Sequence, residues 1–78
     1  MPEIMQKVQS AFQEAFSVDP SLVTMEATPN QIPGWDSLGH ASLAATLEQV
    51  FNVSLDIDDL MAMEDVRSVV AVLQKKLQ

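Results

Sequence analysis

Apolar residues recur at helical spacing near the start of the chain, between residues 3 and 17. The spacing i, i+4, i+7, i+8 and i+11 predicts an amphipathic helix whose apolar stripe faces a core. The stripe consists of Ile4, Val8, Ala11, Phe12 and Ala15. Pro2 suits the first turn of this helix, because its missing N–H would have no intrahelical partner there.

Two later stretches carry the same periodicity. A helix is expected from about Ser37 to Phe51, with Asn52 as a left-handed cap. Another is expected from about Glu64 to Leu77, because acidic residues at its front and lysines at its back suit a helix dipole. The apolar faces are Leu43, Leu47, Val50 and Phe51 in the first, and Val66, Val69, Val70, Leu73 and Leu77 in the second.

Helical periodicity is lost from Val18 to Trp35, where prolines, Asn30 and Gly34 signal turns. We expect a long loop with a helical turn after Asp19, since so long a connection needs anchors in the core. The expected anchors are Leu22, Val23, Met25 and Ile32. Further on, Asp56 is expected to cap a short helix that contains Ile57, Leu60 and Met61. Together, the expected helices and loop indicate an all-α fold with three longer helices, one short helix and a long first loop.

The composition agrees with a single small helical domain spanning residues 1–78. Hydrophobic residues make up 47% of the chain, tyrosine is absent and glycine is scarce, which favours helices over sheet. A domain of this size buries only roughly 60% of the surface that its unfolded chain exposes. The sequence has no cysteine, so no disulfide or zinc–thiolate site can stabilise it, and we predict no metal site.

The charge of the chain restricts its partners. Eleven acidic against four basic residues give a net charge of -7, which repels nucleic acid and anionic membranes. A protein with a basic patch is the natural complement, met in transient encounters. The chain lacks an apolar run of membrane-spanning length, and Met1-Pro2-Glu3 does not begin a signal peptide. We therefore expect a cytoplasmic monomer without membrane insertion.

One heptapeptide carries candidate chemistry, Gly34-Trp35-Asp36-Ser37-Leu38-Gly39-His40. Asp36 can accept a hydrogen bond from an amide of the first helical turn, which leaves Ser37 one position inside, exposed and near the positive end of the helix dipole. A phosphate ester on Ser37 would be stabilised there.

This segment resembles the attachment motif of the acyl carrier protein family. The resemblance covers essentially the whole chain. The resemblance rests on the Asp-Ser-Leu tripeptide after Gly34, on Leu43, Leu47 and Phe51 downstream, and on the segment Phe51-Asn52-Val53-Ser54-Leu55.

The resemblance implies a four-helix bundle of the acyl-carrier type. It also implies that Ser37 carries a covalent 4′-phosphopantetheine donated by coenzyme A, with Asp36 beside it recognised by the phosphopantetheinyl transferase. The thiol of that arm would hold acyl or aminoacyl intermediates as thioesters and present them to loading and processing enzymes with basic docking patches. The chain would be a carrier and not an enzyme.

Candidate partner contacts lie on the second and third helices. Leu38, Ala41 and Ala45 share a face of the predicted second helix that points away from its core stripe. Residues 38–47 contain no acid, and Ser42 stands where typical fatty-acid carriers have glutamate. This departure from the family pattern favours a specialised biosynthetic pathway, with docking on the Leu38 face and the third helix. The predicted contacts are Leu38, Ala41, Ala45, Glu48, Asp58 and Asp59.

The same residues allow other interpretations. Ser37 could merely start a helix in an unmodified acidic adaptor that acts through protein binding alone. A hydrolase with His40 as its base is disfavoured, since the motif lacks the first glycine of a nucleophile elbow. His40 is therefore read as a surface residue and Trp35 as a packing residue. Asp56, Asp58 and Asp59 lack the glycine and glutamate of a calcium loop.

Overall fold

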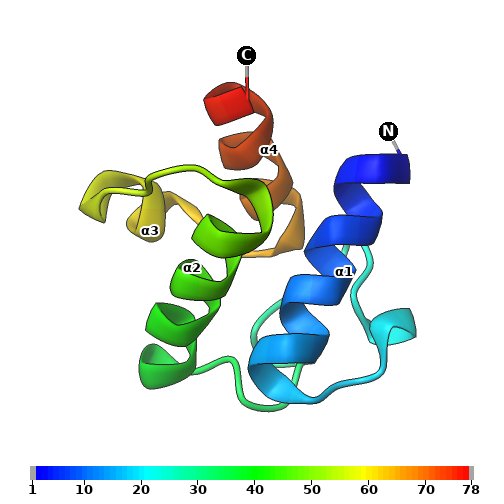
Figure 1. The fold of residues 1–78 in the computed structure, drawn as a ribbon. Helices are drawn as coiled ribbons and strands as arrows, with labels where there is room; N and C mark the ends of the chain where they lie inside the picture. Colours follow the sequence, from blue (N-terminus) through cyan, green and yellow to red (C-terminus); the bar gives the residue numbers. More distant parts are fainter. Residues whose placement is uncertain (1, 78) are drawn as a thin grey trace.

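The computed structural model describes residues 2–77, and over these residues every regular element is helical (Figure 1). The elements are α1 (Pro2–Phe16), the short 3₁₀ helix η1 (Pro20–Leu22), α2 (Ser37–Phe51), α3 (Ile57–Ala62) and α4 (Val66–Leu77). In Figure 1, α1 and α2 stand side by side and run in opposite directions, α3 lies at the outer side of α2, and α4 covers the upper end. The predicted fold of three longer helices, one short helix and a long first loop is confirmed.

The core is formed by the predicted apolar faces together with side chains from the loops. Leu77 was predicted on the apolar face of the last helix, and this was wrong, since it is 47% exposed in the last turn of α4. Phe12 of α1 contacts Trp35 edge to face, with ring centroids 4.9 Å apart. Leu43 and Leu47 of α2 and Leu73 of α4 are fully buried. The other core residues are Val8, Ala11, Val18, Val23, Ala27, Ile32, Ala44, Phe51, Met63, Val66, Val69 and Val70.

The long first loop is anchored largely as predicted. Val23 and Ile32 are buried, and Met25 packs against the core while half-buried. Leu22 was predicted as a fourth anchor, and this was wrong, since its side chain is 46% exposed at the end of η1. The helical turn after Asp19 is confirmed, with the Asp19 carboxylate accepting the Ser21 N–H at 2.9 Å.

The ends of the helices follow local backbone chemistry. Asn52 adopts the predicted left-handed conformation, with φ 57°. The first helix ends at Phe16, one residue earlier than expected, because Ser17 also has a positive φ of 56°. The last helix begins at Val66 and not at Glu64, because the Asp65 side chain accepts the Ser68 N–H at 2.8 Å and so caps it.

None of the helices within residues 2–77 has both the length and the apolar character that crossing a bilayer requires.

Candidate functional site

The turn before α2 is built by two glycines. Gly34 has φ +90°, which residues with a Cβ rarely adopt, and its carbonyl accepts the Asp36 N–H at 3.0 Å. A Cβ on Gly39 would lie only 1.8 Å from the Gly34 carbonyl oxygen. The loop therefore approaches the first turn of α2 more closely than any side chain at position 39 permits.

This turn places Ser37 at the first position of α2, with its side chain exposed. Asp36 has an extended backbone, and its carboxylate accepts the Gly39 N–H at 2.8 Å, which confirms the predicted N-cap. Ser37 thus lies at the positive end of a 15-residue helix, where a phosphate ester is electrostatically favoured.

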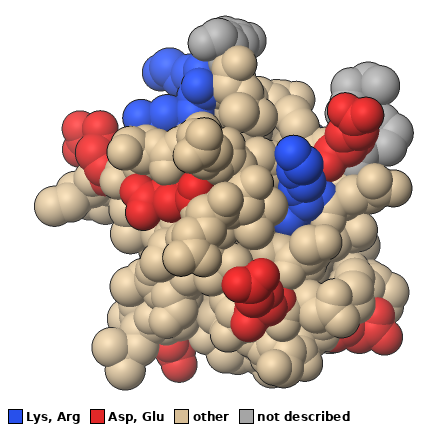
Figure 2. Space-filling view, viewed as in Figure 1, with Lys and Arg blue, Asp and Glu red and all other residues tan. Residues whose placement is uncertain are grey.

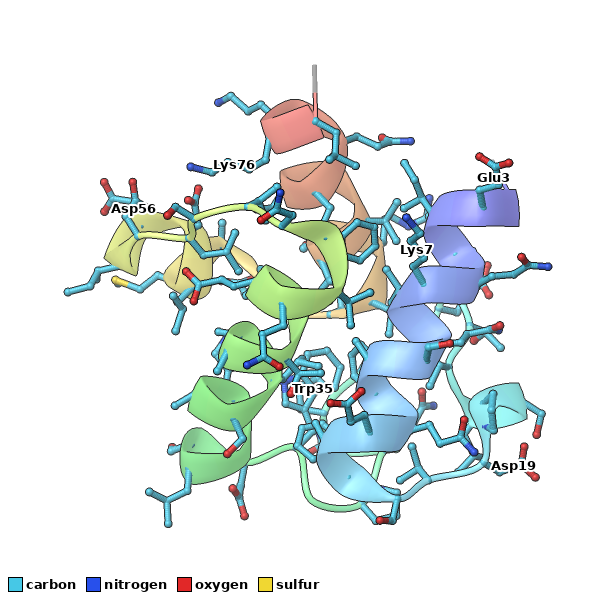
Figure 3. All side chains as sticks on the ribbon, in the orientation of Figure 1. Glu3, Lys7, Asp19, Trp35, Asp56 and Lys76 are labelled. Atoms are coloured by element: carbon cyan, nitrogen blue, oxygen red, sulfur yellow. The ribbon has the colours of Figure 1, made fainter. Side chains whose placement is uncertain are left out.

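His40 lies one turn further along α2 and joins three parts of the chain. The Trp35 indole N–H donates to Nδ1 of His40 at 2.8 Å, and Nε2 lies 2.8 Å from the Leu60 carbonyl oxygen in α3. An indole nitrogen can only donate, so Nδ1 is the acceptor, and the proton on Nε2 is donated to Leu60. His40 is half-buried, so the prediction of a surface histidine was wrong. The prediction that Trp35 packs in the core is confirmed, since it is 4% exposed. Figure 3 shows the Trp35 side chain between α1 and α2.

The hydrogen bonds of His40 bear on the hydrolase interpretation. A general base for Ser37 would need a free ring nitrogen directed at the serine hydroxyl. Both nitrogens of His40 are engaged elsewhere, one by Trp35 and the other by Leu60. The arrangement of this residue is structural and does not match a nucleophile–base pair.

An open hollow of about 460 Å³ lies beside Ser37. It is lined by Pro29, Trp35, Asp36, Ser37 and His40. The serine is therefore accessible to a partner enzyme, and a group esterified to it has room without displacing the core. The residues present fit a phosphopantetheine arm in both respects, the helix terminus for its phosphate and the open hollow for the chain that follows.

The predicted contact residues Leu38, Ala41 and Ala45 are all exposed, and Leu38 is 85% exposed. We call these three residues the Leu38 strip. Two large apolar side chains of α3, Ile57 at 75% and Met61 at 70%, are also exposed. Both residues were expected in the short helix, but their exposure was not predicted, because a helix of six residues is too short for periodicity to separate a core face from a surface face.

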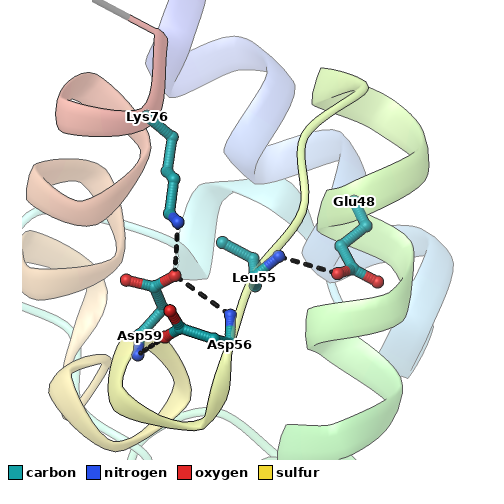
Figure 4. A network of polar contacts seen from close by, with 5 residues as sticks. All are labelled: Glu48, Leu55, Asp56, Asp59 and Lys76. Atoms are coloured by element: carbon teal, nitrogen blue, oxygen red, sulfur yellow. Dashed lines mark hydrogen bonds and ion pairs between the residues drawn. The ribbon is translucent and has the colours of Figure 1, made fainter.

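The acidic residues predicted to contact partners differ in their surroundings (Figure 4). The Glu48 carboxylate accepts the Leu55 N–H at 2.8 Å, so the only acid of α2 fixes the connection to α3. Asp59 accepts the Asp56 N–H at 3.0 Å, completes a capping box and pairs with Lys76 at 2.8 Å. Both therefore have intramolecular roles, and partner contact by either stays a prediction. Asp58 is exposed.

The ion pair between α3 and α4 shifts the titration of both partners. The hydrogen bond from Lys76, together with the Asp56 N–H, lowers the pKa of Asp59 below its usual 3.8. The same contact raises the pKa of Lys76 above its usual 10.5. Figure 2 shows the lysines at the end of α4 above the acidic side chains near α3. Within residues 2–77 no group of three or more His, Cys, Asp and Glu side chains is arranged to hold a metal ion.

Comparison with known proteins agrees with this geometry. Residues 34–73 match the family model described as a phosphopantetheine attachment site. The acyl carrier protein of Thermotoga maritima is 39% identical over 75 residues, which cover 96% of this chain and 93% of the relative. That of Amoebophilus asiaticus is 35% identical over 77 residues, covering 99% and 96%. The solution NMR structure of a holo acyl carrier protein from Geobacter metallireducens superposes with a TM-score of 0.84 at 28% identity, covering 99% of this chain and 87% of that one.

The fold and the match at the α2 turn define a carrier that bears a covalent 4′-phosphopantetheine. The chain belongs to the acyl carrier protein family. Members of this family are carriers that receive their arm from a phosphopantetheinyl transferase and serve acyl-processing enzymes. The predicted fold type and cofactor are confirmed.

Proposed function

We propose that Ser37 is the residue to which the phosphopantetheine is attached. The observation that carries this proposal is the position of Ser37, exposed at the first residue of α2 and on the edge of the open hollow. The residue also lies within the stretch that matches the attachment-site model. The serine oxygen forms a bond to the diphosphate phosphorus of coenzyme A that carries the pantetheine, the P–O bond to the other phosphate breaks, and adenosine 3′,5′-bisphosphate leaves. The partner transferase supplies the base that takes the serine proton, since the nitrogens of His40 are engaged.

The residues around Ser37 position the modified side chain. Asp36 fixes the start of α2 through its hydrogen bond to Gly39, and the aligned amides of the first turn stabilise the negative phosphodiester. The thiol of the arm, when bound, holds an acyl or aminoacyl group as a thioester. The protein itself supplies position and a surface for docking, and it catalyses no step of the transfer.

We test the attachment site with a pair of serine variants. The folded protein is incubated with coenzyme A and a broad-specificity phosphopantetheinyl transferase, and its intact mass is measured. The wild type and Ser42→Ala should each gain one arm, because Ser42 is exposed on the same helix but away from its N-terminus. Ser37→Ala should gain none while keeping its helical circular dichroism. Loading of Ser37→Ala, or no loading of the wild type beside a carrier that is modified, would contradict the proposal.

We further propose that partners dock on the Leu38 strip and on α3. With about 100° per residue, the strip lies about 40–100° from Ser37 around α2, away from the buried face. The side chains of Ile57, Met61 and Asp58 on α3 are exposed, and the two helices are in contact. Apolar contacts on this surface would hold the partner. The acidic side chains, with Glu48 and Asp59 among them, would attract its basic patch.

Two exposed leucines provide a matched test of the docking surface. Leu38→Ala removes an 85% exposed side chain from the strip, and Leu22→Ala removes a 46% exposed one from η1. Leu38→Ala should slow loading by the transferase severalfold with little change in melting temperature, and Leu22→Ala should leave the loading rate unchanged. If Leu38→Ala instead melts far lower and its folded fraction loads at the normal rate, Leu38 supports the fold and not docking.

The departure of α2 from the acidic pattern of fatty-acid carriers supports a role in a specialised pathway. We also propose that the carrier is a monomer and that it acts in the cytoplasm. Residues 38–47 contain no acid, and the sole carboxylate of α2 is bound to the backbone of Leu55. Transfer of fatty-acyl groups by standard synthase enzymes should therefore be slower than with a fatty-acid carrier, and transfer at an equal rate would contradict this part of the proposal. Cell fractionation and light scattering of the native protein test its location and its oligomeric state.

A further inference from the structure

The hollow and the Leu38 strip lie on opposite sides of Ser37. At about 100° per residue, His40 lies about 60° from Ser37 in one direction around α2, and the strip lies about 40–100° in the other direction. Pro29 from the first loop also lines the hollow. A tether attached to Ser37 can therefore turn towards the hollow without covering the strip.

The hollow offers apolar contact and a few polar groups that are already in use. Its walls include Pro29, Trp35 and the half-buried His40 ring. The indole N–H and both His40 nitrogens have partners, so these rings offer mainly carbon surface. Asp36 is exposed, and a carboxylate that accepts one hydrogen bond from Gly39 can accept more.

The phosphopantetheine chain carries both kinds of group that these features would bind. After the phosphate and one methylene it carries a carbon with two methyl groups, then a hydroxyl and an amide. The methyl groups suit the walls of Pro29 and Trp35, and the hydroxyl or amide N–H suits the free lone pairs of Asp36. Because a short tether gives an effective concentration in the millimolar range, weak contacts of this kind populate the bound position.

We propose that the hollow is the resting site of the arm's dimethyl-bearing segment when no partner enzyme is bound. This inference rests on the attachment of the arm to Ser37 proposed above. With the arm in the hollow, a partner enzyme can dock on the Leu38 strip before the arm leaves the hollow. Docking of the partner and withdrawal of the arm are then separate events. Trp35 is then a direct reporter of the state of the arm.

The test compares the apo and holo proteins by NMR, after the intact mass shows that one arm has been added. We expect nuclear Overhauser effects from the arm's methyl groups to the Pro29 ring and the Trp35 indole protons. The indole N–H resonance should also shift between the two forms. Trp35 is the chain's one tryptophan and tyrosine is absent, so the emission of Trp35 should change on loading without interference.

A pair of loop variants supplies the control. Pro29→Gly removes a wall of the hollow and should reduce the holo-induced changes at Trp35 at least severalfold. The neighbouring Asn30→Gly alters an exposed residue that does not line the hollow, and should keep them. Both variants should still gain the arm, because Ser37 is unchanged.

The outcomes separate the two proposals. If the arm is added and its methyl groups contact Leu38 or Ala41, or contact no protein proton while the Trp35 resonance stays in place, the resting site is refuted and the attachment site stands. If Asn30→Gly abolishes the Trp35 changes as fully as Pro29→Gly, the changes do not come from the hollow and the inference is refuted. If no arm is added at Ser37, both proposals fail together.

Discussion

Replacing Gly39 with alanine tests how the turn before α2 positions Ser37. The new Cβ would lie 1.8 Å from the Gly34 carbonyl oxygen and 2.9 Å from Cε1 of Phe16. Ordinary contact begins near 3.4 Å, so the backbone around Gly34 must move by about 1.6 Å. Overpacking of this kind costs about 1–3 kcal/mol, and the higher helix propensity of alanine returns at most about 1 kcal/mol.

The net loss of up to about 3 kcal/mol should lower the melting temperature, by about 4–8 °C for each kcal/mol in a domain of this size. Far-ultraviolet circular dichroism measures the transition. Loading with the arm should also slow at a temperature where the variant is folded, because the moved loop carries Asp36 and Ser37 with it. Ala71→Gly is the control, since it changes an exposed position inside α4 and should cost about 1 kcal/mol without affecting loading. A Gly39→Ala protein that melts above the wild type and loads at the normal rate would refute the reasoning.

Two further substitutions test the contacts that hold α3. His40→Ala leaves the buried Trp35 indole N–H without its acceptor, which should lower the free energy of unfolding by about 1–3 kcal/mol, as measured by chemical denaturation. Ordinary surface substitutions change this free energy by less than about 0.5 kcal/mol, so a change that small would contradict the hydrogen bond. Lys76→Gln should lower the melting temperature near neutral pH more than Lys75→Gln, which changes the net charge equally. Because the pKa of Asp59 is lowered, the stability that its charge contributes to the fold is lost as the pH falls below 3.8. Because the pKa of Lys76 is raised, the stability that its charge contributes is lost as the pH rises above 10.5. The difference between the two variants should therefore vanish at both extremes, and a difference independent of pH would exclude the ion pair as its source.

The features that the sequence predicts correctly are local. The left-handed cap at Asn52 and the N-cap at Asp36 depend on residues within one helical turn, and the structure has both. The start of α4 was misplaced because two neighbouring acids are compatible with a helix start, and only the hydrogen bond of Asp65 decides between them. Leu22 was misassigned because no periodicity exists in the loop to indicate which side faces the core.

The contacts that sequence reasoning missed join distant segments. The Leu60 carbonyl that accepts from His40 lies twenty residues further along the chain. Leu55 is seven residues after Glu48, and the two meet only because the chain turns back beside α2. Such pairings depend on how the helices pack, which no local pattern of residues records.

The central claim is that the hydroxyl of Ser37 carries the prosthetic arm in the working protein. The direct measurement is peptide mapping by mass spectrometry of the protein purified from its native host in active form. The account predicts a phosphopantetheinyl group on the peptide that contains Ser37, with fragment ions that place it on this residue. An active protein whose Ser37 is unmodified, or whose arm is attached to another residue, would contradict the account.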